Sequence, residues 1–298
     1  MNGLESGQPQ IQQWTELLLE QGWCVIPDAV PPQLIAALDT DLERDFRETP
    51  FCKGGFYGAR TKRFGRLLAR SAFARELVQH PLILGITKQV LGPWCDTIQL
   101  NLMQALALHP GAPPQLPHRD QDMWRGAIGE TEYLVNVMWP FTRYTRENGA
   151  TIVWPRSHGR RALDAEAPPG EFAAELDPGS ALLFLGSTLH GAGGNASDSV
   201  RRGAIISYCL GWLKPYENQW LAYPPAIARH FNPELAALVG YQQHRPNLGN
   251  YEGQCPSVLL QRNIPDRFAA TDALRPDQEA LVAEFVDGHN WPEPAAAA

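Results

Sequence analysis

The chain has 298 residues, of which 44% are hydrophobic and 19% are charged, and its formal net charge is −7. This length and composition suffice for one large or two small globular domains with a substantial core, so a disordered chain is not expected. The negative charge offers no basic field for nucleic acid or an anionic membrane surface, and we expect neither as a partner.

The cysteines and the N-terminal segment predict a cytoplasmic protein. The five cysteines are scattered, with no CxxC pair, which is typical of reduced thiols in a reducing compartment. No basic segment precedes an apolar run at the start of the chain, and no stretch approaches the roughly twenty apolar residues of a membrane span. Whether the protein is a monomer or a homodimer stays open.

The first third of the chain is predicted to be mainly helical. Apolar residues recur at helical spacing over residues 11–21, and a short strand is expected at 23–27. A second helix is expected from Pro31 to about Arg47, and one or two more over residues 71–91. The basic run Arg60-Thr61-Lys62-Arg63 is interpreted as a solvated turn; the alternative is a lid that contacts an anionic or polar substrate.

Strand-forming segments dominate after Asp96. Runs of strand-forming residues broken by turn residues predict strands at residues 97–108, 133–141, 151–155, 181–190 and 201–213. Many short strands without intervening helices favour a sandwich or barrel over a parallel α/β sheet. The last part, residues 218–291, is expected to contain helices at 233–239 and 276–286.

The triplet His118-Arg119-Asp120 is the sharpest local motif. In an extended backbone, residues i and i+2 point to the same face with Cα atoms about 6–7 Å apart, so an imidazole and a carboxylate can bind one metal ion. Asp122 shares that face, but its Cα would lie about 13 Å from that of His118. Asp120 is therefore the preferred ligand. So short a motif needs structural context.

The context comes from His190, which ends an apolar run 72 residues later. The loop 191–199 then returns the chain into the next strand, which predicts a β-hairpin that brings Arg201 or Arg202 close to His190. Two histidines and one carboxylate leave three positions open on iron, as in oxygen-activating non-haem enzymes. A 2-oxo acid can occupy two of these positions while a guanidinium binds its far carboxylate. Strand alternation sends the two arginines to opposite faces but does not choose between them.

These residues resemble a known family. His118-x-Asp120, His190-Gly191 and the basic residue eleven positions later are similar to the phytanoyl-CoA hydroxylase-like family of iron(II)- and 2-oxoglutarate-dependent dioxygenases. Asn148-Gly149-Ala150-Thr151 and Pro155-Arg156-Ser157-His158 match its segment between the iron-binding strands, and the resemblance covers roughly residues 14–213.

The resemblance implies a mainly β fold with helical flanks and a double-stranded β-helix (jelly roll, cupin-like) core. We expect a single dioxygenase domain over residues 1–298, with a helical N-terminal part at about 1–95, the jelly-roll core at about 96–215 and a helix and loop C-terminal part at about 216–298. Within the family, Gln104, Gln115 and Trp124 around the triplet make the chain similar to the natural-product tailoring members of secondary metabolism.

The same resemblance assigns roles to individual residues. It implies that His118, Asp120 and His190 are the catalytic iron ligands and that Arg201 binds 2-oxoglutarate.

Further contacts to 2-oxoglutarate are expected from polar residues near the triplet. Gln104, Gln115 and Thr151 are candidates for hydrogen bonds to it. Ala192 stands where the acyl-CoA enzymes have a serine, so one such contact is expected to be missing or supplied by Thr151. Trp124 is a candidate to line the substrate side, and His158 is interpreted as a turn residue rather than a fourth ligand.

The function implied is the oxidation, most simply the hydroxylation, of a hydrophobic small molecule with molecular oxygen, releasing succinate and carbon dioxide. Related halogenases replace the carboxylate ligand with a small residue, and Asp120 is retained here. Desaturation, rearrangement and endoperoxide formation use the same ligands and stay open. The alternatives are a metal-dependent hydrolase or isomerase of cupin-like fold and a non-catalytic jelly-roll binding module. Neither enzyme alternative needs the arginine eleven residues after His190.

Overall fold

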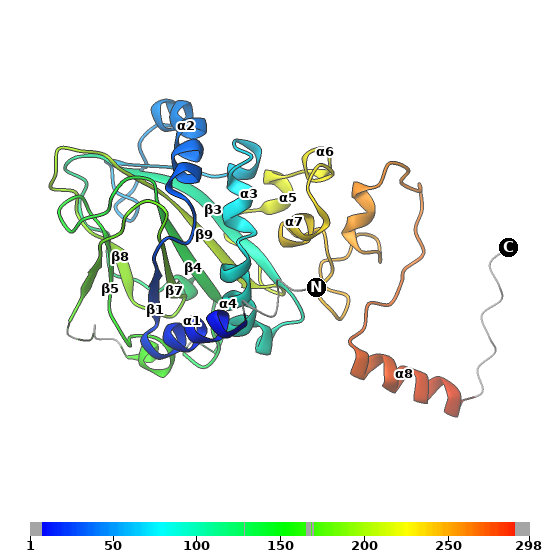
Figure 1. Cartoon of the computed structure of the whole chain (residues 1–298). Coiled ribbons are helices and arrows are strands. Elements are labelled where there is room, and N and C mark those ends of the chain that lie inside the picture. The colour runs from blue at the N-terminus through cyan, green and yellow to red at the C-terminus, as the bar shows by residue number, and fades with distance from the viewer. Residues whose placement is uncertain (1–7, 128, 165–167, 169, 290–298) are drawn as a thin grey trace.

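The computed structural model describes residues 8–127, 129–164, 168 and 170–289, and its core consists of two antiparallel β-sheets (Figure 1). The larger sheet contains β1 (Trp23–Ile26), β2 (Thr61–Phe64), β3 (Ile98–Leu108), β4 (Leu134–Pro140), β7 (Ala181–Leu185) and β9 (Arg201–Leu210). The smaller sheet contains β5 (Thr151–Val153), β6 (Phe172–Ala174) and β8 (His190–Ala192). The strand orders are β1-β7-β4-β9-β3-β2 and β6-β5-β8.

The two faces of the larger sheet have different partners because side chains alternate along each strand. On β3, Met103 and Ala105 belong to the core shared with the N-terminal helices, whereas Leu102 and Leu106 belong to a second core that faces the smaller sheet. This arrangement of two antiparallel sheets with helices on one side is the expected double-stranded β-helix, and the predicted fold class is confirmed.

Helices cover the outer face of the larger sheet. The N-terminal helices are α1 (Gln8–Gln21), α2 (Pro32–Glu48), α3 (Ala74–Val78) and α4 (Pro81–Leu91). Prolines in the first turns of α2 and α4 suit these positions, where a backbone N–H has no partner within the helix. After α1 the chain turns at Gly22, whose φ of 82° favours glycine and whose N–H donates to Leu18 O at 2.8 Å.

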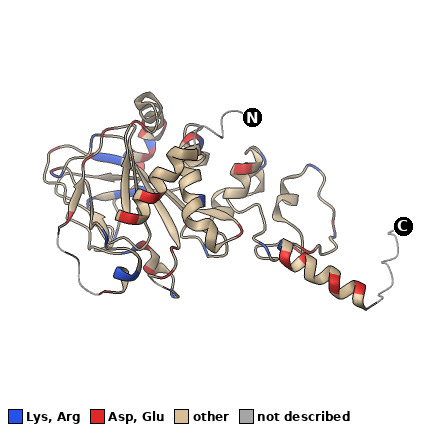
Figure 2. Ribbon diagram, turned by 60° about the horizontal axis from the view of Figure 1, so that its bottom comes forward, with Lys and Arg blue, Asp and Glu red and all other residues tan. Residues whose placement is uncertain are grey.

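In the described range, the C-terminal part contains three short helices and one longer helix. These are α5 (Gln219–Ala222), α6 (Pro225–Ala228), α7 (Pro233–Leu238) and α8 (Pro276–Gly288), and the short 3₁₀ helices of the chain are η1 (Leu67–Ala69), η2 (Gly92–Trp94), η3 (Asp120–Met123), η4 (Gly159–Leu163) and η5 (Pro256–Leu260). Figure 1 shows α8 well away from the two sheets, in agreement with its lack of any buried residue. Figure 2 shows that the charged residues of α8 are acidic.

Two further observations bear on the sequence-based expectations. The five cysteines are all free thiols. Within the described ranges, no helix has both the length and the apolar character required to cross a membrane.

Two predicted segments are wrong. Residues 181–190 form two strands in different sheets, β7 and β8, separated by a turn that begins at Gly186. The predicted hairpin is absent, because β4 lies between β7 and β9 and pairs with both. The basic run at residues 60–63 is not a solvated turn either: Thr61–Phe64 is an edge strand that pairs with β3.

Candidate active site

The two histidines of the predicted metal site are held together by their own backbones. His118 N donates to His190 O at 2.9 Å, and His190 N donates to His118 O at 3.0 Å, so the two residues form an isolated antiparallel bridge. Asp120 follows as the first residue of η3. One ligand atom from each of the three side chains lies within 4.8 Å of the others, which is the spacing of ligands around one metal ion.

The second nitrogen of each imidazole fixes its orientation. His118 Nδ1 donates to Leu116 O at 2.8 Å, and His190 Nδ1 donates to Thr188 O at 3.0 Å. Each Nε2 then carries the lone pair and faces Asp120, at 3.3 Å from Oδ1 for His118 and 3.6 Å from Oδ2 for His190. Backbone carbonyls that orient histidines in this way are a regular feature of metal sites.

The charges of the site also suit a cation. Burial lowers the pKa of His190 to about 4, so its imidazole is neutral at pH 7. Burial raises the pKa of Asp120, but His190 and His118 together lower it by more than burial raises it. The net pKa of Asp120 therefore lies below its ordinary value. A neutral imidazole and an ionised carboxylate are the protonation states that bind a metal. The residues present therefore fit an iron ion.

Asp122 is not part of this cluster. The backbone leaves the extended conformation at Asp120 and enters the 3₁₀ helix η3, so the expected straight strand through Asp122 is wrong. Asp122 is exposed. Its exclusion as a ligand still agrees with the structure.

The three side chains lie at a cavity of about 350 Å³ between the two sheets. Its wall is largely apolar and includes Phe56, Leu102, Leu106, Met123, Met138, Phe184 and Ile205. Phe184 and Phe56 pack against the ligand imidazoles, with ring centroids 4.5 Å from His190 and 4.8 Å from His118. The cavity therefore offers an apolar space next to the metal-ligating side chains.

Alternation on β9 places Arg201 in this cavity and Arg202 on the opposite face. Arg201 is 1% exposed, and its Nη1 donates to Gly149 O at 2.8 Å. Its guanidinium carbon lies 4.2 Å from the ring centroid of Tyr144, and its buried Nε has no hydrogen-bond partner among the described residues. The guanidinium is thus oriented from one side and retains donor capacity toward the cavity.

Arg202 interacts with a helix instead. It forms ion pairs with Asp39 and Glu43 of α2 and lies over the ring of Phe46, with its guanidinium carbon 4.6 Å from the centroid. These partners occupy Arg202 on the outer face of the sheet.

The support of Arg201 depends on a glycine. A Cβ on Gly203 would lie 1.9 Å from the hydroxyl oxygen of Tyr144 and 2.7 Å from Trp139 O. We expect Gly203→Ala to displace Tyr144 and to lower the free energy of unfolding by about 1–3 kcal/mol, because the site is overpacked. Urea denaturation measures this. Gly92→Ala is the control, because a Cβ there meets nothing within 4 Å, and equal stability of the two variants would contradict the prediction.

The structure brings the other predicted residues to the same cavity. Gln104 on β3, Thr151 on β5 and Gln115 all line it, and so does Ala192. Gln115 Oε1 accepts a hydrogen bond from Ala192 N at 3.3 Å. Thr151 is 4% exposed.

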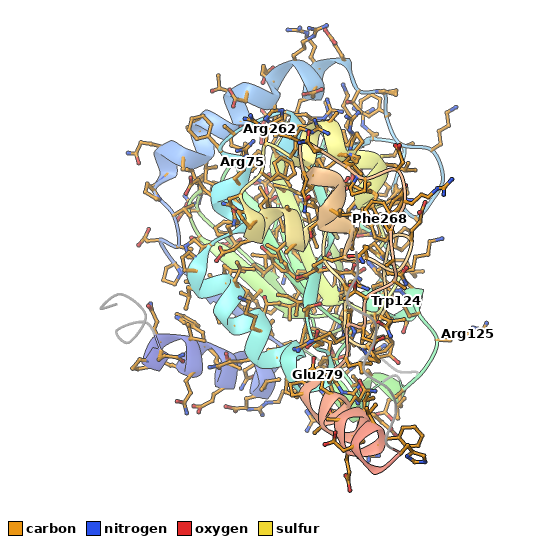
Figure 3. The ribbon with its side chains drawn as sticks, turned by 90° about the vertical axis from the view of Figure 1, so that its right-hand side faces the viewer. Arg75, Trp124, Arg125, Arg262, Phe268 and Glu279 are labelled. Atoms are coloured by element: carbon orange, nitrogen blue, oxygen red, sulfur yellow. The ribbon has the colours of Figure 1, made fainter. Side chains whose placement is uncertain are left out.

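Trp124 does not line the cavity, which corrects the expectation for it. Its Nε1 donates to Lys214 O at 2.9 Å, and its ring packs against Tyr133 with centroids 6.3 Å apart. Figure 3 labels it next to Arg125 on the loop that follows η3. Met123, one residue earlier, lines the cavity instead. His158 Nε2 donates to Leu19 O at 2.7 Å, and the residue lies outside the metal cluster, as expected for it.

The cavity is also lined from loops by Phe56, Tyr57 and Tyr216, which were not predicted from the sequence. No periodic pattern marks these positions. Arg63 belongs to the basic run that was interpreted as a solvated turn, with a substrate-contacting lid as the alternative, and the structure places it on β2 at the cavity. The segment Thr61–Phe64 has no alternation of apolar and polar residues, so no local signal identified it as a strand.

Glu132 supports the turn before His190. Its carboxylate accepts hydrogen bonds from the Ser187 hydroxyl and from Ser187 N, and Ser187 Oγ in turn accepts from Gly159 N at 3.1 Å. Burial raises the pKa of Glu132 above its ordinary value, although the hydrogen bonds from Ser187 lower it in part. The folded protein therefore binds the proton of the Glu132 carboxyl group more tightly than the unfolded chain does.

The consequence is a defined pH dependence. Stability from Glu132 is fully present below the ordinary glutamate pKa, and it is lost as the pH rises through the raised pKa of the folded state. Between pH 4 and pH 7 we expect the free energy of unfolding to fall less in Glu132→Gln than in wild type. The difference between the two falls is expected to be about 1 kcal/mol or less. Urea denaturation across this range measures the difference, with the exposed Glu130→Gln as control. Parallel curves for wild type and Glu132→Gln would contradict it.

Comparison with known proteins identifies the family. Residues 18–203 match the family Phytanoyl-CoA dioxygenase (PhyH). The chain is similar to the dioxygenase aneA of Aspergillus aculeatus, at 32% identity over 79% of this chain and 83% of that protein. It is also similar to the dioxygenase trt7 of Aspergillus terreus, at 29% identity over 78% of this chain and 84% of that protein.

Solved structures agree on the fold. The non-haem α-ketoglutarate-dependent epimerase SnoN from nogalamycin biosynthesis superposes with a TM-score of 0.58 and 17% identity, over 70% of this chain and 87% of that one. HygX from Streptomyces hygroscopicus, solved with nickel, 2-oxoglutarate and hygromycin B, gives a TM-score of 0.55 and 14% identity over 68% and 88%. The chain therefore belongs to the phytanoyl-CoA dioxygenase family and is a non-haem iron(II)- and 2-oxoglutarate-dependent dioxygenase.

Proposed function

We propose that this dioxygenase hydroxylates a hydrophobic small molecule and releases succinate and carbon dioxide from 2-oxoglutarate. The observation that carries the proposal is the convergence of three metal-type ligands and one buried arginine on a single, largely apolar cavity. Bound iron(II) and 2-oxoglutarate supply the oxidising chemistry, in which oxygen is reduced while the oxo acid is decarboxylated.

The protein residues bind and orient in this scheme. His118, Asp120 and His190 hold iron. Arg201 binds the far carboxylate of 2-oxoglutarate, because its guanidinium is buried, oriented by Gly149 O and free to donate toward the cavity.

Three polar side chains of the cavity wall act as further hydrogen-bond partners of 2-oxoglutarate. These are Gln104, Gln115 and Thr151. Ala192 offers no hydroxyl, so Thr151 takes the part of the serine found in the acyl-CoA enzymes.

The wall of the cavity supports a hydrophobic substrate. Burial of apolar surface against Phe56, Met123 and their neighbours stabilises an apolar molecule and excludes water from the metal-ligating side chains. SnoN is an epimerase and SnoK, a further structural neighbour, is a carbocyclase, so this fold serves several outcomes. We infer a role in natural-product metabolism from these neighbours, with hydroxylation as the leading reaction.

We also infer that the chain acts as a single dioxygenase domain in the cytoplasm, as a monomer or homodimer. The free state of the five cysteines supports a reducing compartment.

The test is the coupling of substrate oxidation to the conversion of 2-oxoglutarate into succinate. The iron(II)-loaded protein is mixed with 2-oxoglutarate and a panel of hydrophobic natural products in air-saturated buffer. We expect at least one compound to raise succinate formation above the substrate-free rate and to gain 16 mass units, the mass of one oxygen atom. Loss of 2-oxoglutarate without succinate, or product formation without 2-oxoglutarate, would contradict the proposal.

A further inference from the structure

The residue between two of the predicted iron ligands has a side chain that connects separate parts of the site. Arg119 has an extended backbone, with φ −118° and ψ 125°, so its side chain points away from the face that carries His118. Its Nε donates to Ser187 O at 3.1 Å, and its Nη2 donates to Ser157 O at 3.4 Å. One guanidinium group therefore binds two backbone carbonyls from distant segments of the chain.

The two carbonyls belong to turns that adjoin the strand of His190. Ser187 lies in the turn from β7 to β8, and Ser157 lies in the turn after β5, the strand that pairs with β8. Both serines are 0% exposed. A buried carbonyl needs a hydrogen-bond donor, and a guanidinium offers its donors in a rigid planar fork. Arg119 thus connects its own segment to both turns next to His190.

The peptide groups next to these carbonyls orient His190. Its Nδ1 donates to the carbonyl of Thr188, the residue that follows Ser187, at 3.0 Å. On the other side, Ser157 Oγ accepts from Leu189 N at 2.8 Å. A displacement of either turn would therefore move the peptide groups of residues 188 and 189 and change the direction of His190 Nε2.

Opposite charges hold Ser187 from two sides. Glu132 accepts from its N–H and its hydroxyl, while Arg119 donates to its carbonyl. Burial lowers the pKa of Arg119 below its ordinary value, and Asp122 and Asp164 raise it only in part. A guanidinium is still charged at neutral pH. The bond to Ser187 O is thus charge-assisted, and such bonds are about twice as strong as neutral ones.

Arg119 uses its donors differently from Arg201. Both side chains contribute to the cavity wall. Arg201 donates to Gly149 O through Nη1, and its Nε has no hydrogen-bond partner among the described residues. Arg119 instead directs its Nε and Nη2 to the two turns. Its contacts are therefore with the segments that carry the metal ligands.

We propose that Arg119 is a positioning residue that sets the direction of His190 relative to His118 and Asp120 and thereby the affinity of the site for iron(II). It adds a side-chain connection to the backbone bridge between the two histidines. It acts through the carbonyls of the two turns, as outer partners of metal ligands do. This inference rests on the proposed function, because it assumes that these three ligands hold iron.

The test measures iron(II) affinity separately from stability. The iron-free proteins are titrated anaerobically with iron(II), and their free energies of unfolding are measured with urea. In Arg119→Gln we expect iron(II) affinity to fall about 10- to 100-fold. In Arg119→Lys we expect a fall of about threefold to tenfold, because one ammonium does not reproduce the planar fork. A purely structural role would lower only the free energy of unfolding and leave the affinity of the folded protein unchanged.

The affinity for 2-oxoglutarate separates positioning from direct contact. With iron(II) at a concentration that saturates each variant, we expect the dissociation constant of 2-oxoglutarate to stay within about threefold of wild type, because Arg201 and Gly149 are unchanged. Arg125→Gln is the control. Arg125 is exposed on the loop that follows η3 (Figure 3), and this variant should bind iron(II) as wild type does.

Several results would overturn the inference. One is an iron(II) affinity of Arg119→Gln within about twofold of wild type. Another is a loss of 2-oxoglutarate affinity at unchanged iron(II) affinity, since Arg119 would then contact the oxo acid. An equal loss of iron(II) affinity in Arg125→Gln would assign the effect to net charge. If Arg119→Gln does not fold, Arg119→Lys decides, and wild-type affinity in that variant overturns the inference. Absence of iron(II) binding by wild type would instead contradict the proposed function.

Discussion

Replacement of His190 by glutamine is expected to lower the affinity for iron(II) by more than about 100-fold, since loss of a ligand exceeds the 10- to 100-fold effect of losing a residue that only orients one. His190 is 6% exposed and lies beside Asp120 at the cavity. Glutamine leaves its backbone bridge to His118 intact, so the change addresses the metal rather than the fold. Iron(II) titration under anaerobic conditions measures the affinity.

The control for this prediction is His230→Gln. His230 is exposed and lies outside the cluster of metal-type ligands in the described chain. We expect its iron affinity to equal that of wild type. Tight iron binding by His190→Gln would show that the metal site lies elsewhere.

Replacement of Arg201 by glutamine is expected to weaken the binding of 2-oxoglutarate by about 30-fold or more, while iron(II) affinity is retained. The reason is that a buried carboxylate loses its charged partner, which costs about 2–5 kcal/mol. Equilibrium titration of the iron-loaded protein with 2-oxoglutarate measures the change.

Arg202→Gln is a matched control, one residue along the same strand and on the opposite face. It removes partly exposed ion pairs with Asp39 and Glu43, and we expect a loss of about 1 kcal/mol or less in stability with no change in 2-oxoglutarate affinity. If Arg202→Gln weakens 2-oxoglutarate binding as much as Arg201→Gln does, the assignment of the cavity arginine is wrong.

Local patterns were sufficient to predict most of the helices and strands and a sandwich or barrel, whereas the double-stranded β-helix was implied by the family resemblance. Helical spacing located α1, proline and glycine signals located α2 and the end of α4, and strand-forming runs between turn residues located β3, β4 and β9. The helices α2 and α4 bury one face each, whereas β3, β4 and β9 are buried on both faces and therefore read as largely apolar runs. The His118-Arg119-Asp120 triplet and His190 were brought together as the motif required.

The errors arise where tertiary contacts override the local pattern. The apolar run 181–190 looks continuous, because both β7 and β8 are buried, and its turn is formed by Gly186 and Ser187, which are held by Leu134 and Glu132 from distant segments. The sequence contains no local signal for these partners. For the same reason it could not show that β4 lies between β7 and β9.

The choice between Arg201 and Arg202 also depends on distant residues. Alternation predicts opposite faces, but only the position of α2, whose Asp39 and Glu43 bind Arg202, shows which face is outside. The family resemblance implies Arg201 for the binding of 2-oxoglutarate. The lining residues Tyr57 and Tyr216 come from irregular loops, where periodicity carries no information.

The most direct test of the iron and 2-oxoglutarate assignment is anaerobic addition of 2-oxoglutarate to the iron(II)-loaded protein, followed by visible absorption. A weak charge-transfer band is expected in wild type, and it should be absent in His190→Gln and strongly weakened in Arg201→Gln at the same ligand concentration. A wild-type protein that binds zinc tightly but shows no such band with iron(II) and 2-oxoglutarate would contradict the assignment.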